Sequence, residues 1–169
     1  MKKILLLSII TTLVFNNSYA QKNAIAAYVE LGGAGIASAN FDMRIQKKED
    51  GLGFRVGIGA LSVRSDFGSN SDKTTLTTIP LELNYLVGKD QRNYFEMGVG
   101  ATIISINDRS TGYYGTSNDK FRSTFGHLYF GYRLQPKNGG FLFRAGLTPV
   151  FGNGFFIPYW AGVSFGYKF

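Results

Sequence analysis

The feature that most constrains the fold of this chain is a two-residue alternation of apolar and polar side chains. From residue 52 to residue 60, every even position is apolar and every odd position is glycine or arginine. Successive side chains of a β-strand point to opposite faces, so the pattern predicts strands with one apolar and one polar face. Eight segments show it, approximately Ala27–Ala34, Ser38–Ile45, Leu52–Leu61, Leu76–Val87, Tyr94–Ile106, Phe125–Leu134, Phe141–Val150 and Pro158–Phe169. An even number of alternating segments of about ten residues is typical of a transmembrane β-barrel.

The connections between these segments alternate between short and long. Compact polar stretches follow the second, fourth and sixth segments, with the sequences QKKEDG, GKDQRN and QPKNGG. Longer stretches follow the third, fifth and seventh segments, at Ser62–Lys73, Asn107–Lys120 and Phe151–Ile157. Short turns on one rim and longer loops on the other are typical of outer-membrane barrels. We therefore expect residues 62–73 and 107–120 to be surface loops open to a ligand, with Tyr113-Tyr114 either a recognition tip or resting on the membrane surface.

The size of the barrel decides which face points inward. An eight-stranded barrel has an interior just wide enough for side chains. The apolar face carries most of the Phe and Tyr residues, whose bulk does not fit there, whereas the other face is rich in glycine with a few long charged side chains. The apolar face must therefore point outward into lipid, and the ring of strands must be closed because lipid offers no hydrogen bonds to the backbone. The predicted fold is an all-β, eight-stranded antiparallel up-and-down transmembrane barrel.

The first twenty residues have the layout of a secretory signal peptide. Lys2 and Lys3 precede an apolar run, and Ser18-Tyr19-Ala20 forms a small-x-small cleavage site before Gln21. We expect residues 1–20 to be removed and residues 21–169 to form one barrel domain. The chain contains no cysteine, so an exported form has no disulfide framework. Its positive charges are spread along the chain without a basic run, which argues against a nucleic-acid partner.

Four phrases carry a resemblance to a known group of proteins. The stretches GLGFRVGIG, IPLELNYLVGKD, GYRLQPKNGGFLFRAGLTPVF and WAGVSFGYKF resemble small outer-membrane barrels of Bacteroidota and, more broadly, the OmpX- and OmpA-like eight-stranded class. The resemblance covers essentially all of residues 21–169 and agrees with a location in the outer membrane. The short turns are expected to mark the periplasmic rim, which places both termini in the periplasm. The resemblance also implies insertion by the barrel-assembly machinery, for which Phe169, an aromatic at the end of the last predicted strand, is the expected signal. It implies no catalytic residues.

Charged residues of both signs share the predicted inward face. General acid–base chemistry or an ion path is one interpretation, and a structural salt-bridge network that fills the lumen is the favoured one. Buried ions must be paired, because each unpaired ion costs several kcal/mol. The predicted network consists of Glu30, Asp42, Arg44, Arg55, Glu82, Glu96, Arg133, Arg144 and Lys168.

His127, the only histidine, keeps one enzymatic interpretation open. Barrel enzymes that acylate or deacylate lipid A resemble this shape and use histidine with serine, and the candidate partners of His127 are Ser123 and Ser105. Such a site requires all its groups within hydrogen-bond reach. A narrow channel is a further alternative, although eight strands rarely leave an aqueous path. One histidine and no cysteine argue against zinc, and we expect neither a metal nor a cofactor.

Overall fold

The computed structural model describes the backbone of residues 23–67, 70–112 and 115–169. The predicted signal peptide, residues 1–20, and the Tyr113-Tyr114 pair lie outside these residues. No helix in the described ranges is long and apolar enough to cross a membrane.

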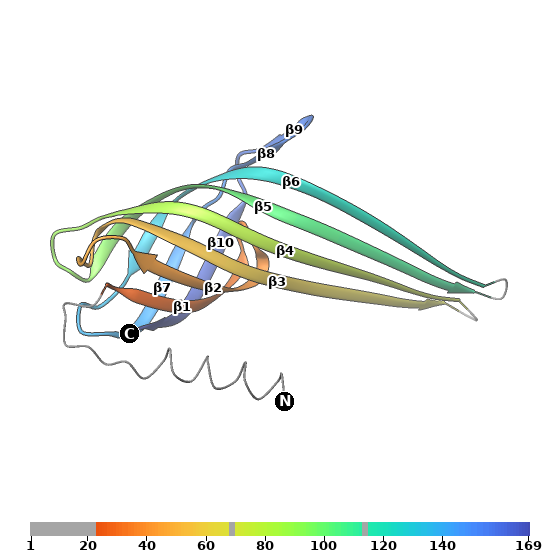
Figure 1. Ribbon diagram of the computed structural model, residues 1–169, viewed down its shortest axis with the longest axis horizontal. Coiled ribbons are helices and arrows are strands. Elements are labelled where there is room, and N and C mark those ends of the chain that lie inside the picture. Colours follow the sequence, from red (N-terminus) through yellow and green to blue (C-terminus); the bar gives the residue numbers. More distant parts are fainter. Residues whose placement is uncertain (1–22, 68–69, 113–114) are drawn as a thin grey trace, which may run out of the picture.

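Eight antiparallel strands form a closed ring (Figure 1). They are β1 (Ile25–Gly32), β2 (Ile36–Arg44), β3 (Gly51–Phe67), β4 (Asn70–Val87), β5 (Asn93–Gly112), β6 (Gly115–Leu134), β7 (Gly140–Leu147) and β10 (Ala161–Lys168). Each strand pairs with the next one around the ring, and β10 pairs with β1 from Lys168 opposite Ala26 to Gly162 opposite Gly32. The predicted eight-stranded up-and-down barrel is confirmed.

A small hairpin leaves the ring after β7. The seventh segment was predicted to run to Val150, but β7 ends at Leu147, and the chain continues through Pro149 into β8 (Val150–Gly152) and β9 (Phe155–Ile157). Proline has no N–H to offer a neighbouring strand, which favours an end to regular pairing at this point. β8 pairs briefly with β6, through Gly126 opposite Phe151. The expected loop 151–157 is therefore a hairpin, and it projects away from the barrel wall (Figure 1).

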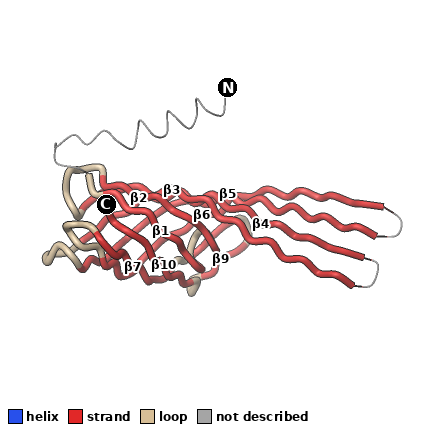
Figure 2. Tube along the Cα trace, turned by 90° about the horizontal axis from the view of Figure 1, so that it is seen from below, coloured by secondary structure: helices blue, strands red, loops and turns tan. Residues whose placement is uncertain are grey.

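The two long surface loops predicted at residues 62–73 and 107–120 are instead largely strand. β3 and β4 pair out to Phe67 opposite Asn70, and β5 and β6 pair out to Gly112 opposite Gly115. The two hairpins also pair with each other, so β3 to β6 form a four-stranded sheet that extends far beyond the barrel (Figure 2). The loop prediction was wrong because both faces of this sheet are largely polar, which removes the alternation, while its many threonines still favour strand.

The compact turns all lie at the other end of the barrel, together with residues 23 and 169. They span residues 45–50, 88–92 and 135–139. In the second turn, the Asn93 side chain and the backbone amides of Asn93 and Arg92 donate hydrogen bonds to the Asp90 carboxylate. These bonds, the Asn93 side chain first, hold the pKa of Asp90 below its ordinary value. They also secure a tight turn in which Gln91 has a positive φ of 55°.

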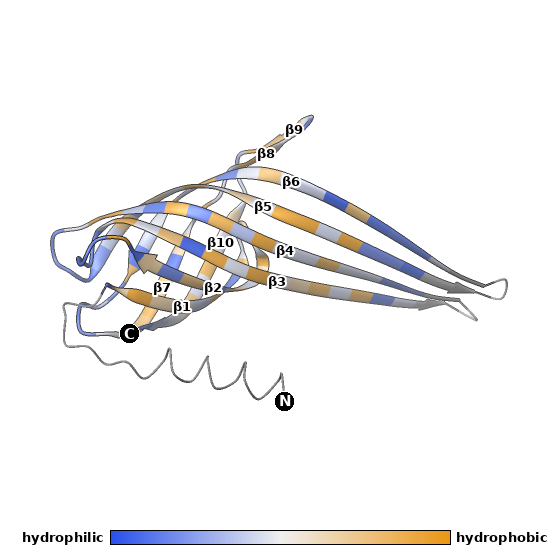
Figure 3. Ribbon diagram, in the orientation of Figure 1, coloured by the Kyte–Doolittle hydropathy of each residue, from blue (hydrophilic) through white to orange (hydrophobic). Residues whose placement is uncertain are grey.

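The two faces of the wall are sorted as the alternation predicts. Val99 is 54% exposed and Leu83 is 52% exposed, whereas Arg144 and Glu96 are 0% exposed. Figure 3 shows the same alternation of apolar and polar residues along the barrel strands, and a mostly polar extension. An apolar outside and a charged inside are the reverse of a water-soluble barrel, so this surface is suited to lipid.

The cost in stability of a charge on the outer face should therefore depend on how deep in the apolar band the charge lies. Val99→Arg, near the middle of the apolar band of β5, should lower the free energy of unfolding by about 2–4 kcal/mol in lipid vesicles. Asn107→Arg lies on the same face of the same strand but beyond the band, and should cost at most about 1 kcal/mol. Denaturant titration of both variants in vesicles measures the difference. Equal costs would show that the apolar face is not in contact with the hydrocarbon.

Candidate functional site

The charged side chains of the interior form one connected group at the centre of the barrel. Its middle is Arg144 on β7, which donates two hydrogen bonds to Glu96 on β5, from Nε to Oε2 at 2.8 Å and from Nη2 to Oε1 at 2.9 Å. The same guanidinium lies 3.5 Å from Glu30 and 3.5 Å from Glu82. A bidentate pair with two further carboxylates close by gives this arginine a strong and oriented set of partners.

Two tyrosine rings contact the guanidinium of Arg144. Its Cζ lies 4.8 Å from the ring centre of Tyr28 and 4.4 Å from that of Tyr129, and its Nη1 donates to the Tyr28 hydroxyl at 2.8 Å. Such contacts with aromatic rings stabilise a cation that has lost its water. These two tyrosines are an exception to the expectation that aromatic bulk stays outside. They fit because a Cβ on Gly166 would lie 2.3 Å from the Tyr28 Cβ, and one on Gly131 would lie 2.6 Å from the Tyr129 hydroxyl.

Toward the turn end of the barrel, Asp42 joins two more arginines to the group. Its Oδ1 lies 2.7 Å from Arg44 and 3.0 Å from Arg133. Arg133 also lies 3.4 Å from Glu96, which connects Asp42 to the centre. Asn84 bridges the same two carboxylates, because its Nδ2 donates to Asp42 at 2.5 Å and to Glu96 at 3.1 Å.

Toward the extended sheet, Arg55 occupies the corresponding position. It lies 2.6 Å from Glu30 and 3.5 Å from Glu82, and its Nε donates to Asn40 at 2.9 Å. Glu30 also accepts a hydrogen bond from the backbone N–H of Gly35 at 3.1 Å, in the turn between β1 and β2. This end of the group is therefore fastened to the chain that closes the first hairpin.

The structure brings together eight of the nine residues predicted from the sequence. The four carboxylates are those of Glu30, Asp42, Glu82 and Glu96, and the four guanidiniums are those of Arg44, Arg55, Arg133 and Arg144. Equal numbers of opposite charges make the group formally neutral, which limits the cost of burying it. We call these eight residues the lumen cluster.

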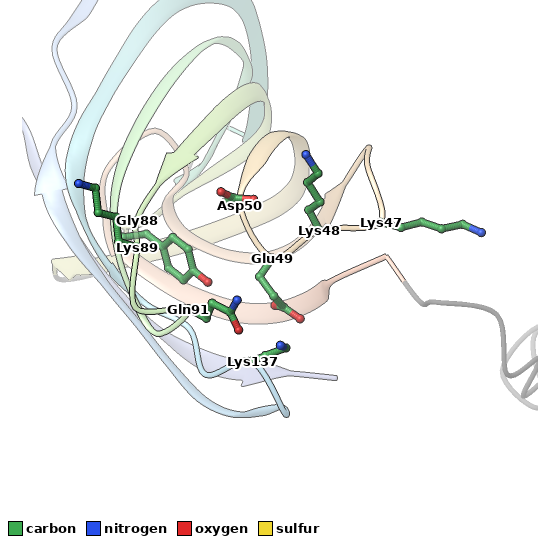
Figure 4. Close-up of a pocket in the computed structure, with 9 residues that line it drawn as sticks. Lys47, Lys48, Glu49, Asp50, Gly88, Lys89, Gln91 and Lys137 are labelled. Atoms are coloured by element: carbon green, nitrogen blue, oxygen red, sulfur yellow. The ribbon is translucent and has the colours of Figure 1, made fainter.

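The ninth predicted residue, Lys168, is placed elsewhere. Its Nζ lies 2.7 Å from Glu49 and donates to the backbone carbonyl of Lys137, at the turn end of the barrel. Gln135 donates to Glu49 as well, so the first turn is tied to the third. The three turns surround an open cavity of about 630 Å³ whose lining includes lysines and acidic residues (Figure 4). The partner of Lys168 is thus a turn residue, Glu49, which strand alternation cannot indicate.

His127 does not lie close to either serine that was considered as its partner. It is completely buried, with Nε2 3.3 Å from Glu82 and Nδ1 3.4 Å from the Thr102 hydroxyl. Ser105 has the outward parity of β5, and Ser123 lies four residues from His127 along β6, about 13 Å away at the rise of a strand. The alternative with a His–Ser pair is therefore wrong in its geometry, and His127 extends the lumen cluster through Glu82.

Phe169 follows the last strand on the outside of the barrel. It is 68% exposed, its backbone N–H donates to the carbonyl of Ile25 at 2.9 Å, and its ring lies 5.3 Å from that of Tyr167. Other exposed aromatic residues lie at the turn ends of other strands, including Tyr85 on β4, Phe95 on β5 and Phe141 on β7. Phe169 therefore belongs to a ring of aromatic side chains around this end of the barrel.

A closed ring of eight antiparallel strands, with an apolar outer face and a charged interior, has the architecture of an outer-membrane β-barrel. No family model and no curated protein matches the chain in sequence. Solved structures do match in fold. The N-terminal β-barrel domain of Pseudomonas aeruginosa OprF is 16% identical, with a TM-score of 0.55, and the match covers 87% of this chain and 96% of that one.

Two further structures give the same result. A major outer membrane protein of Thermus thermophilus is 13% identical, with a TM-score of 0.54, over 88% of this chain and 99% of that one. Ail, the attachment invasion locus protein of Yersinia pestis, crystallised with the heparin analogue sucrose octasulfate, is 10% identical, with a TM-score of 0.52, over 87% and 97%. At these identities the likeness is one of fold.

The lumen cluster should be sensitive to the loss of one member. Glu96→Ala removes the bidentate partner of Arg144 and a partner of Arg133, and should lower the free energy of unfolding by about 3–5 kcal/mol. The matched variant Glu49→Ala breaks a pair whose carboxylate is 23% exposed and whose lysine is 4% exposed, and it should cost less, about 1–2 kcal/mol, because Lys168 keeps its hydrogen bond to the Lys137 carbonyl. Denaturant unfolding of both variants in detergent micelles measures the two costs. Similar small losses would show that the interior admits enough water to solvate an unpaired arginine.

Proposed function

We propose that this chain is an integral outer-membrane protein of a Gram-negative bacterium, with a lumen filled by side chains and a structural or surface-interaction role. The observation that carries the proposal is the lumen cluster: eight buried charged side chains bind one another across the barrel. Interactions that span the lumen in several directions hold the strands together and occupy the space an ion would need. The resemblance to small barrels of Bacteroidota supports the same role.

The proposed orientation places the turns and both ends of the barrel domain in the periplasm and the four-stranded sheet outside the cell. Short periplasmic turns and long external hairpins are the usual arrangement. In this orientation the barrel-assembly machinery meets the last strand and Phe169 from the periplasm. The surface available to a partner is the extended sheet, which contains residues 62–67, 70–73, 107–112 and 115–120.

A channel and a barrel with a filled lumen should differ in ion conductance. The wild-type protein in planar lipid bilayers should show no discrete conductance steps, because the paired side chains leave no continuous water path. The double variant Glu96→Ala/Arg144→Ala removes an ion pair from the middle of the cluster and should show small steps. Heat-modifiable migration on detergent gels confirms that both proteins are folded. Discrete steps from the wild type would overturn the filled-lumen proposal.

The orientation can be tested because the chain contains no cysteine. A membrane-impermeant maleimide applied to intact cells should label Ser117→Cys, at the far end of β6. It should not label the matched variant Lys48→Cys in the first turn until the outer membrane is permeabilised. Both positions are exposed, so the reagent reaches each of them once it has crossed the membrane. Labelling in the reverse order would invert the proposed orientation.

A further inference from the structure

The extended sheet has two faces of opposite charge. Directly paired residues of neighbouring antiparallel strands point to the same face. Arg64 pairs with Lys73, and Lys73 pairs with Arg109, so three cations form one row across β3, β4 and β5. Lys120, paired with Asn107, and Arg122, paired with Ser105, lie on the same face of β6. We call these five residues the cationic face.

The opposite face carries the acidic residues of the sheet. Asp108 pairs with Asp119 and with Thr74, and Asp72 lies one row further out. Among the described side chains of the extended sheet, every cation lies on one face and every anion on the other. The four cations Lys73, Arg109, Lys120 and Arg122 are exposed, and the structure gives them no salt bridge within the described residues. The charge of these four residues is therefore available to an external partner.

The cationic face continues the lipid-facing surface of the barrel. Ile79 pairs with Ile103 in the last apolar row of β4 and β5, and both side chains point outward. Arg122 lies in the next outward row, Lys120 in the one after it, and Arg109 in the third. At about 3.3 Å per residue these rows are roughly 7, 13 and 20 Å beyond the apolar band, measured along the strands. The headgroup layer adds about 5–7 Å on each side of the hydrocarbon, so Arg122 lies at its level, and the rows of Lys120 and Arg109 continue the positive charge outward from it.

The aromatic hairpin of β8 and β9 supports the same position for the boundary between hydrocarbon and headgroups. It branches from β6 at Gly126, four residues along that strand from Arg122, and carries the exposed side chains of Phe155 and Phe156. Tyr159, which is 85% exposed, and Trp160 follow it. Aromatic side chains of this kind gather where hydrocarbon meets headgroups.

We propose that the cationic face binds the phosphate groups of anionic membrane lipids in the leaflet around this end of the barrel. The inference rests on the proposed function, because it requires the barrel to span a membrane. Lys and Arg near an anionic lipid surface each contribute substantially to binding, and arginine pairs with phosphate in two-point geometry. Lipid is favoured over a soluble polyanion because the cationic face continues the lipid-facing wall, which places the Arg122 row beside the headgroups of the surrounding leaflet.

The test measures which lipids surround the cationic face. Ser105→Trp in a Trp160→Phe background puts a single tryptophan among the cations, since Trp160 is the only natural one. The full chain is reconstituted in phosphatidylcholine vesicles that contain either brominated phosphatidylglycerol or brominated phosphatidylcholine, both of which quench tryptophan. We expect a preference of about fivefold or more for the anionic lipid at this position. The natural Trp160, on the other side of the ring, should show no such preference.

Two quadruple variants identify the residues responsible. Lys73→Gln/Arg109→Gln/Lys120→Gln/Arg122→Gln in the reporter background should abolish the preference. The matched control Lys47→Gln/Lys48→Gln/Lys89→Gln/Lys137→Gln removes the same charge at the turn end and should leave it intact. Equal quenching by the two lipids, or equal loss in both variants, would overturn the proposal.

The remaining outcomes separate this inference from the proposed function. Heparin binding in detergent that depends on the four cations, without any lipid preference in vesicles, would assign the face to a polysaccharide and reject the lipid. Heat-modifiable migration is recorded on the same vesicles. A folded barrel without lipid preference rejects the inference alone, whereas a chain that never shows barrel migration rejects the proposed function as well.

Discussion

The structure depends on closure of the hydrogen-bonded ring. A strand at the edge of an open sheet leaves a row of N–H and C=O groups unpaired, and hydrocarbon provides no partner for them. The first and last strands, β1 and β10, meet over seven residue pairs, so no edge is left in the barrel wall. The extended sheet of β3 to β6 does have open edges, and its polar composition is that of a region surrounded by water. The same strands thus change from closed wall to open sheet where the outward residues change from apolar to polar.

Closure of the ring also limits which side chains the interior can hold. Eight strands leave a narrow space, and strand alternation makes every second residue point into it. Glycines on the inward parity make room for a few long side chains: a Cβ on Gly53 would lie 2.2 Å from the guanidinium carbon of Arg44, and one on Gly100 would lie 2.6 Å from Nε2 of His127. Large charged groups are packed against these glycines inside the barrel, and pairing between acids and bases makes their burial tolerable.

Much of this architecture could be predicted from the sequence, and the failures have physical causes. The alternation located the eight strands and identified their two faces, because the difference in polarity between the lipid-facing and inward-facing positions is large. It failed at residues 62–73 and 107–120, where the side chains on both faces are largely polar and the contrast disappears. The inward-facing positions of the strands also predicted which residues belong to the lumen cluster, but not which residues pair with one another. The pairing of Asp42 with Arg133, 91 residues apart, depends on the stagger of the closed ring.

The two ends of the barrel use charge in different ways. At the turn end, Glu49 and Lys168 neutralise each other, and the turns fold toward the mouth of the barrel. At the other end the cations are separated from the acids by the thickness of one sheet, and this separation leaves both faces charged. The register of β3 with β4 is the same on both sides of a break opposite Pro80, and β4 with β5 keeps one register throughout, so the stagger that builds the lumen cluster also aligns Arg64, Lys73 and Arg109 in one row. The outward charge pattern is therefore a consequence of the register that the interior requires.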